Sequence, residues 1–168
     1  MKIFLIGFMG CGKSTMGKKL AVKLGYDFID LDHQIEKNLG TTITAYFAEN
    51  GEEAFRKLES ETLKNFDYPS NAIIATGGGA PCFFDNMDWM NANGLSIYIE
   101  MSAAALAKRL ESGKEKRPLL KDLSEAEMVR FIEDKLTERE RFYKRAGVTV
   151  NGISLSADAM RAMILSRQ

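Results

Sequence analysis

Short apolar runs alternate with longer amphipathic stretches along this chain of 168 residues. The five runs that have the length and composition of β-strands are residues 2–6, 26–30, 72–76, 95–99 and 147–150. Between them, apolar residues recur at helical spacing. This alternation predicts a parallel sheet with helices on both faces.

Signals for helix ends agree with this interpretation. Glycine can take a left-handed cap conformation, and a serine with a glutamate three residues later forms a capping box. The helices predicted in this way are one ending near Gly25, one ending near Gly40, and the segments 52–66, 102–110, 124–143 and 156–166.

One segment breaks the alternation. Residues 112–123 are polar and basic, are interrupted by Pro118, and have no periodicity of their own. Because loops of about a dozen residues in a compact domain are often lids or binding loops, we expect a lid here.

The composition indicates one domain over residues 1–168 that is large enough for a hydrophobic core. Lys plus Arg equals Asp plus Glu at 23 each, so no nucleic-acid or membrane-surface partner is expected. No apolar run has the length of a membrane span, and the first strand leaves no room for a signal peptide. Cys11 and Cys82 lack metal-site spacing, which favours a reduced, cytoplasmic protein.

The octapeptide G-F-M-G-C-G-K-S follows the first predicted strand and precedes a helical pattern, at residues 7–14. In this context the spacing is typical of a phosphate-binding loop. Glycines let backbone N–H groups surround an anion, and the new helix directs its positive dipole end at the same place. Lys13 can reach the β- and γ-phosphates, and the Ser14 hydroxyl can ligate Mg²⁺. The loop therefore predicts binding of a nucleoside triphosphate.

Two carboxylates end the second predicted strand, at Asp30 and Asp32. Residues two apart on a strand face the same way, so both can point into the crevice at the carboxyl ends of the strands. There a carboxylate can hold Mg²⁺ through water or accept a proton from an attacking hydroxyl. One of the two can also simply cap the next helix. His33, the single histidine, is expected on the helix surface.

Three glycines, Gly77, Gly78 and Gly79, follow the third predicted strand, where phosphate-loop proteins commonly carry a metal-binding acid. Their presence suggests that the backbone approaches a ligand closely there, although a flexible turn would look similar. The acidic metal partner must then come from elsewhere, and Asp30 is the candidate.

Arginines form a third group of candidates, because a guanidinium offers paired donors in a fixed plane to carboxylates and phosphates. Arg56 and Glu59 lie three apart on one helix face. Arg117 is in the lid-like loop, and Arg139 lies one helical turn before Tyr143. Taken singly, each arginine is more often a solvated surface residue.

Five motifs occur in a fixed order along the chain: G-F-M-G-C-G-K-S-T at 7–15, D-L-D at 30–32, F-R-K-L-E at 55–59, T-G-G-G at 76–79 and R-P-L-L at 117–120. Many kinases share the first motif, but the combination is specific. In this combination the chain resembles the shikimate kinase family over nearly its whole length.

The resemblance implies the three-layer, nucleoside monophosphate kinase-like fold of P-loop proteins, with five parallel strands in the order 2-3-1-4-5 and a lid. It implies transfer of the γ-phosphoryl group of ATP to the 3-hydroxyl of shikimate, a step toward chorismate and aromatic amino acids. One Mg²⁺ ion per subunit is implied as well. The lid would lie at about 112–123 and the shikimate-binding helical region at about 32–66 of a single kinase domain.

The site residues implied by the resemblance fall into three sets. The nucleotide contacts are Gly10, Cys11, Gly12, Lys13, Ser14, Thr15, Arg109 and Arg117. The shikimate contacts are Asp32, Arg56, Glu59, Gly77, Gly78, Gly79 and Arg139. The metal contacts are Ser14 and, through water, Asp30.

The resemblance also gives roles to some of these residues. Asp32, Lys13 and Arg117 are catalytic, with Asp32 as the base and Arg117 closing over the phosphates. The shikimate carboxylate is held by Arg56 and Arg139. Glu59 supports Arg56, Gly78 contributes a backbone contact, and Arg109 stacks against the adenine.

Two segments depart from the family's pattern. Where the family commonly has R-x-P-L-Y, this chain has R-E-R-F-Y at residues 139–143, so Arg141 competes with Arg139 as the carboxylate ligand. The spacing to Tyr143 favours Arg139. The adenine-contacting segment matches weakly around residues 150–152, and no contact is assigned there.

Two other functions stay open at this stage. A related kinase could phosphorylate gluconate or a nucleoside monophosphate, although the pairing of Asp32 with Arg56 suits a small polyol that carries a carboxylate. A nucleotide-dependent switch would not need an acid placed for acceptor activation. We expect a monomer, because the fold can enclose its own site.

Overall fold

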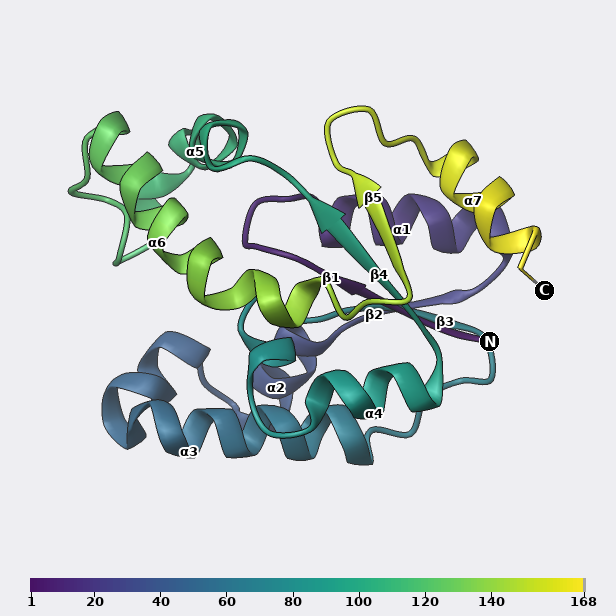
Figure 1. The fold of residues 1–168 in the computed structure, drawn as a ribbon. Coiled ribbons are helices and arrows are strands. Elements are labelled where there is room, and N and C mark those ends of the chain that lie inside the picture. The colour runs from purple at the N-terminus through teal and green to yellow at the C-terminus, as the bar shows by residue number, and fades with distance from the viewer. Residues whose placement is uncertain (168) are drawn as a thin grey trace.

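One parallel five-stranded sheet forms the centre of the molecule (Figure 1) in the computed structural model, which describes residues 1–167. The strand order is β2-β3-β1-β4-β5, as the resemblance implies. The strands are β1 (Lys2–Ile6), β2 (Asp27–Asp30), β3 (Ala72–Ala75), β4 (Leu95–Glu100) and β5 (Val148–Asn151). Each lies within one residue of its predicted ends, so the predicted α/β fold class is confirmed.

Helices cover both faces of the sheet. The α-helices are α1 (Lys13–Leu24), α2 (Leu31–Leu39), α3 (Ile43–Asn65), α4 (Asn86–Asn93), α5 (Ala103–Glu111), α6 (Glu125–Tyr143) and α7 (Ala157–Leu165). Two short 3₁₀ helices are η1 (Ala80–Cys82) and η2 (Lys114–Lys116). Among residues 1–167, no helix combines the length and apolarity needed to cross a bilayer.

Alternating side chains on β1 divide the core into two layers. Ile3 and Leu5 pack against α1 and α7, whereas Phe4 and Ile6 pack against residues of α3, α4, α5 and α6. Figure 1 shows α1 and α7 on one side of the sheet and α3 and α4 on the other. The result is the expected three-layer arrangement.

Most predicted helix ends lie where the cap residues indicated. Gly25 and Gly40 have left-handed backbone conformations after α1 and α2. The hydroxyl of Ser102 accepts a hydrogen bond from the N–H of Ala105 at the start of α5. Ser124 forms the predicted capping box at the start of α6.

The second helical region was predicted incompletely. The segment 52–66 was expected to form one helix, but helical structure already begins at Ile43, and Gly51 interrupts it with a φ of 84° and a ψ of 173°. The short helix α4 was not predicted at all. Only two of its large apolar residues, Met87 and Met90, are fully buried, and its asparagines are weak helix formers.

The segment 112–123 joins α5 to α6 and contains η2 followed by turns. Leu120 anchors it in the core with 1% of its surface exposed, while the neighbouring Leu119 is 70% exposed. Leu123 of the same segment is partly buried and packs against the same core, so apolar contacts hold the end of the segment that precedes α6.

The register of the sheet brings three motifs to one edge. Asp30 on β2 and Leu5 on β1 both lie beside Ala75 on β3. Because the strands are parallel, the loops that follow them leave the sheet on the same side. The phosphate-binding loop, the D-L-D sequence and the glycine turn therefore meet at the carboxyl ends of β1, β2 and β3.

Gly94, just before β4, allows a test of how closely the backbone packs beside β1. Its neighbour is β1, and a Cβ at Gly94 would overlap the backbone carbonyl oxygen of Lys2. We expect Gly94→Ala to lower the free energy of unfolding in urea by about 1–3 kcal/mol. Gly147→Ala, in the same position before β5, should change it by less than about 0.5 kcal/mol, because its nearest atoms would lie 3.5 Å away. Equal effects of the two variants would contradict this packing.

Candidate active site

The loop between β1 and α1 has the backbone geometry of an anion-binding nest. Gly12, the cap of α1, has a φ of 98°, and Gly10 has a φ of 81°, which is the region that favours glycine. The loop leads directly into the N-terminus of α1, where the first N–H groups have no partner within the helix. These N–H groups and the helix dipole make the loop suited to phosphate.

Lys13 and Ser14 start α1 and face the same space. The Lys13 Nζ donates hydrogen bonds to the carbonyl oxygens of Gly7 at 2.8 Å and Phe8 at 3.0 Å. The Ser14 hydroxyl donates to Asp30 Oδ2 at 2.8 Å. The loop's own carbonyls thus hold the ammonium group over the nest, and a serine oxygen lies beside a carboxylate.

A pocket of about 560 Å³ opens above this loop. Its lining combines the loop, the two aspartates, the glycine turn and two arginines: Met9, Gly10, Gly12, Lys13, Ser14, Thr15, Asp30, Asp32, Ala75, Thr76, Gly77, Gly78, Arg109 and Arg117. We call it the phosphate pocket. The two arginines come from α5 and from the segment 112–123.

Asp30 ends β2, whereas Asp32 lies in the first turn of α2. The prediction that both carboxylates belong to the strand was therefore wrong, because α2 begins directly after Asp30. Asp30 caps α2, because its Oδ1 accepts hydrogen bonds from the N–H groups of Asp32 at 3.1 Å and His33 at 3.4 Å. Its other oxygen bonds Ser14, so the capping role and the position beside the phosphate pocket coexist. His33 is exposed, as expected.

A second pocket of about 340 Å³ adjoins the first. Its lining is Phe8, Met9, Asp32, Ile43, Phe47, Glu52, Phe55, Arg56, Glu59, Gly77, Gly78, Gly79, Leu119, Phe131, Lys135 and Arg139. We call it the acceptor pocket. The two pockets share Asp32, so one carboxylate borders both spaces.

Arg56 and Glu59 form an ion pair in the acceptor pocket, with Nη1 of Arg56 2.9 Å from Oε1 of Glu59. Arg56 also lies over the ring of Phe83, 4.3 Å from its centroid. Its Nε is 3.5 Å from Glu52, yet this buried nitrogen has no hydrogen-bond partner among residues 1–167. The guanidinium is therefore held in place and keeps an unused donor.

The glycine turn after β3 lies directly against these carboxylates. A Cβ at Gly77 would be 2.8 Å from Oε2 of Glu59 and 3.0 Å from Oδ1 of Asp32. Such contacts are too close for a side chain, so only glycine allows the backbone to approach Asp32 in this way. A Cβ at Gly79 would likewise lie 2.6 Å from the Arg56 guanidinium, so at Gly77 and Gly79 the backbone closely approaches the charged side chains of the pocket.

Helix α6 brings Arg139 to the acceptor pocket and leaves Arg141 outside it. Arg139 lines the pocket with its guanidinium 5.5 Å from the ring centroid of Phe8. Arg141 is exposed and lies over Phe142. Tyr143 is fully buried, and its hydroxyl donates to the carbonyl oxygen of Gly78. This hydrogen bond joins the C-terminal end of α6, one turn after Arg139, to the glycine turn.

Burial sets the electrostatics of the two acids beside the acceptor pocket. It raises the pKa of Asp32, and the neighbouring charge of Asp30 raises that pKa further, while Lys13 and Arg56 oppose the change. Burial likewise raises the pKa of Glu59, against the opposing effect of Arg56. A carboxylate with a raised pKa is a better proton acceptor than an ordinary aspartate.

A smaller pocket of about 230 Å³ lies on the other side of the phosphate-binding loop. Its lining is Cys11, Gly12, Thr15, Met16, Lys19, Arg109, Gly152, Ile153 and Leu155. It therefore joins the loop and α5 to the segment after β5. Arg109 lies between this space and the phosphate pocket, 3.5 Å from the carbonyl oxygen of Gly10. Cys11 and Cys82 are free thiols.

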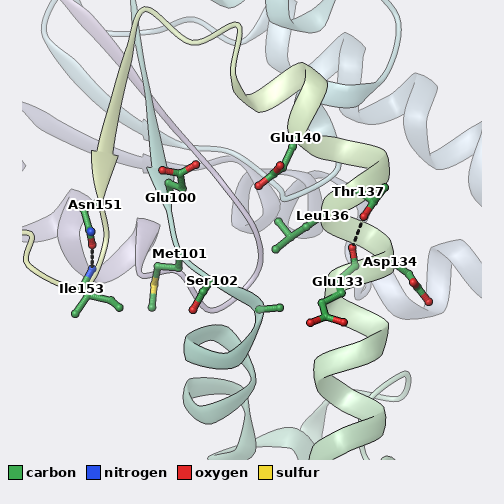
Figure 2. Close-up of a pocket in the computed structure, with 11 residues that line it drawn as sticks. Glu100, Met101, Ser102, Glu133, Asp134, Leu136, Thr137, Glu140, Asn151 and Ile153 are labelled. Atoms are coloured by element: carbon green, nitrogen blue, oxygen red, sulfur yellow. Dashed lines mark hydrogen bonds between the residues drawn. The ribbon is translucent and has the colours of Figure 1, made fainter.

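A larger hollow of about 830 Å³ lies between β4, β5 and α6 (Figure 2), and contains none of the predicted site residues. Its charged side chains are all acidic, namely Glu100, Glu133, Asp134 and Glu140. Like charges would repel the phosphates of a nucleotide from this space. Size alone therefore does not identify the site.

Several lining residues of the acceptor pocket were not predicted. They include the aromatic residues Phe8, Phe47 and Phe131, Leu119 of the segment 112–123, and the charged residues Glu52 and Lys135. Phe131 and Lys135 precede Arg139 at intervals of four, so the period of α6 could have identified them. For Phe47 no signal was available, because its helix was not predicted.

Comparisons with known proteins agree with this geometry. A sequence profile described as shikimate kinase matches residues 9–166. A curated shikimate kinase of Parabacteroides distasonis is 48% identical over 148 residues, which are 88% of this chain and 86% of that protein.

Solved structures of shikimate kinases are similar over the whole chain. The enzyme from Bacteroides thetaiotaomicron has a TM-score of 0.92 and 38% identity, covering 100% of this chain and 99% of that one. The enzyme from Acinetobacter baumannii, solved in complex with shikimate, has a TM-score of 0.87 and 30% identity, covering 99% and 94%. By its sequence and its fold, this chain belongs to the shikimate kinase family.

Proposed function

We propose that the chain transfers the γ-phosphoryl group of ATP to the 3-hydroxyl of shikimate, giving shikimate 3-phosphate and ADP. This reaction is a step toward chorismate and the aromatic amino acids. The observation that carries the proposal is the position of Asp32, which borders both the phosphate pocket and the acceptor pocket. A hydroxyl bound beside Asp32 would face the end of a triphosphate held by the loop.

The nucleotide would be held by the loop that ends in Lys13, with Arg117 from the lid opposite it. Phosphoryl transfer needs positioning and neutralisation of charge more than covalent chemistry. N–H groups of the loop, the ammonium of Lys13 and the guanidinium of Arg117 all face the phosphate pocket. The pocket beside Gly152 and Arg109 is the space in which we place the adenine.

The oxygen atoms of Ser14 and Asp30 fit a Mg²⁺ ion, because this metal prefers a few protein oxygens and completes its shell with water and phosphate. The two side chains are 2.8 Å apart at the edge of the phosphate pocket. No group of three or more His, Cys, Asp or Glu side chains within residues 1–167 could hold a metal by itself. Ser14 and Asp30 would hold the ion, which would supply positive charge to offset the charge of the phosphates during transfer.

The acceptor's carboxylate would be held by Arg56 and Arg139, and its hydroxyl by Asp32. Arg56 is 12% exposed and is oriented by Glu59. Its Nε lies 3.5 Å from Glu52 without a hydrogen bond, so a bound carboxylate can use this donor. Asp32, with its raised pKa, would orient the hydroxyl and accept its proton as the bond to phosphorus forms. The glycine turn contributes backbone contacts at Gly78.

These nucleotide, metal and acceptor contacts fit a single kinase domain with a lid at 112–123 and an acceptor region at 32–66. Arg117 and Leu119 bring the lid into the phosphate pocket and the acceptor pocket respectively. A lid in this place would exclude water and limit hydrolysis of ATP. Residues of one chain line both pockets, which supports a monomer, and the two free thiols support a reducing, cytoplasmic location.

A coupled assay of ADP release tests the function directly. Shikimate, gluconate and AMP would be offered as acceptors at equal concentrations with ATP. We expect turnover with shikimate alone, and we expect that turnover to require added Mg²⁺. Turnover with gluconate or AMP and none with shikimate would refute the assignment.

The role of Asp32 can be separated from nucleotide binding. Asp32→Asn keeps the shape of the side chain and removes the proton acceptor, so we expect kcat to fall by about 100-fold or more. The Kd for ATP should change by less than about threefold, because Asp32 acts on the acceptor side. Asp67→Asn, at an exposed position, is the control. Nearly normal turnover of Asp32→Asn would remove this residue from the mechanism.

The two arginines of α6 form a matched pair of variants. Arg139→Met removes a cation that lines the acceptor pocket, and the loss of about 2 kcal/mol would raise KM for shikimate by about 30-fold. Arg141→Met removes an exposed cation on the same helix and should leave KM unchanged. Steady-state kinetics with saturating ATP would measure both. The reverse order of effects would mean that Arg141 binds the carboxylate.

A further inference from the structure

Helix α6 presents three residues to the acceptor pocket at intervals of four: Phe131, Lys135 and Arg139. Residues four apart on a helix lie on the same face, one above the other. Lys135 is therefore one turn from Arg139 along the pocket wall. Its charge has no part in the mechanism described so far.

The charges of the acceptor pocket balance only when Lys135 is counted. Three carboxylates line it, from Asp32, Glu52 and Glu59, and three cations, from Arg56, Lys135 and Arg139. Without Lys135, the carboxylates of the pocket would outnumber its cations, and the pocket would repel an anionic acceptor.

Lys135 also differs from Arg56 in its ion pairs. Arg56 pairs with Glu59 at 2.9 Å and lies 3.5 Å from Glu52. In the described part of the chain, no ion pair joins Lys135 to a carboxylate that lines the pocket. Its one ion pair is with Glu138 at 3.6 Å, and the two side chains are 38% and 67% exposed. Exposed pairs of this kind contribute little to stability, so the ammonium group of Lys135 can leave Glu138 for a ligand at little cost.

The opposite face of α6 has the opposite charge. Glu133 and Glu140 point into the hollow between β4, β5 and α6, as Figure 2 shows. The helix thus separates an acidic surface from a pocket wall that carries Lys135 and Arg139. Glu133 and Glu140 therefore face away from the acceptor pocket, while Lys135 and Arg139 line it, which favours an anion at this wall of the pocket.

We propose that Lys135 is a second cationic contact for the carboxylate of the acceptor, acting with Arg139 at the mouth of the pocket. The inference rests on the proposed function and adds to it a residue that selects anionic polyols over neutral ones. Lys135 is half-exposed and on a flexible stem, so it contributes to capture of the acceptor rather than to the transition state. An interaction of equal strength in both states changes KM and leaves kcat unaltered.

A variant that removes the charge of Lys135 and keeps an unbranched side chain tests this role. We expect Lys135→Met to raise KM for shikimate by about 3- to 5-fold, the upper part of the range for a partly exposed charge contact. The kcat and the KM for ATP should stay within about twofold, and Lys135→Arg should restore KM for shikimate. Lys144→Met is the matched control, because Lys144 is the exposed C-cap residue of α6 and pairs with Glu140 at 3.2 Å outside the acceptor pocket.

The methyl ester of shikimate separates a contact with the carboxylate from a packing effect. The ester lacks the negative charge, so wild type and Lys135→Met should have the same KM for it. With shikimate, the difference between the two proteins should shrink in about 0.5 M salt, because salt screens exposed charges. Thermal unfolding would verify that the variant folds like the wild type.

The outcomes distinguish the inference from the function on which it rests. An unchanged KM for shikimate in Lys135→Met, with a wild type that turns shikimate over, would overturn the inference alone. An equal rise in KM for shikimate and for its ester would also overturn it, since the lysine would then act through packing. A wild type without activity on shikimate would refute the proposed function, and the inference would fall with it.

Discussion

Parallel pairing of β1, β2 and β3 is the constraint on which the site depends. Ala75 on the middle strand is level with Leu5 on one side and Asp30 on the other, so three loops leave the sheet together. That arrangement alone brings a nest of N–H groups, a pair of aspartates and a turn of glycines to one place. None of these segments is adjacent to the next in the sequence, and none could form the site by itself.

Charge and burial then divide the shared space into two halves. The phosphate pocket is lined by the phosphate-binding loop, three cations and the two aspartates. The acceptor pocket is lined by carboxylates and guanidinium groups among aromatic rings. Asp32 lies at the boundary, and its burial raises the pKa of its carboxyl, because the charged form loses contact with water. The glycine turn makes this possible, because a side chain at Gly77 would occupy the space that Asp32 and Glu59 require. Tyr143 holds the same turn from the far side by its bond to Gly78.

Local signals predicted the strands and most helix ends, because apolar runs, caps and glycine positions act over a few residues. The motif residues Lys13, Asp32 and Arg56 could also be named, since their spacing is tied to chemistry. The interruption at Gly51, the short helix α4 and the apolar wall of the acceptor pocket could not be predicted in this way. They depend on which segments pack together. Lys135 was missed for a related reason, because a lysine on an amphipathic helix is usually solvated.

The central claim is that one carboxylate, Asp32, connects the two pockets. A crystal structure with shikimate, Mg²⁺ and a non-hydrolysable ATP analogue would test it most directly. The account predicts a hydrogen bond between Asp32 and the 3-hydroxyl, with that oxygen about 3–3.5 Å from the terminal phosphorus and in line with the bond to be broken. Shikimate bound with its 3-hydroxyl turned away from Asp32, or in the acidic hollow beside α6, would contradict it.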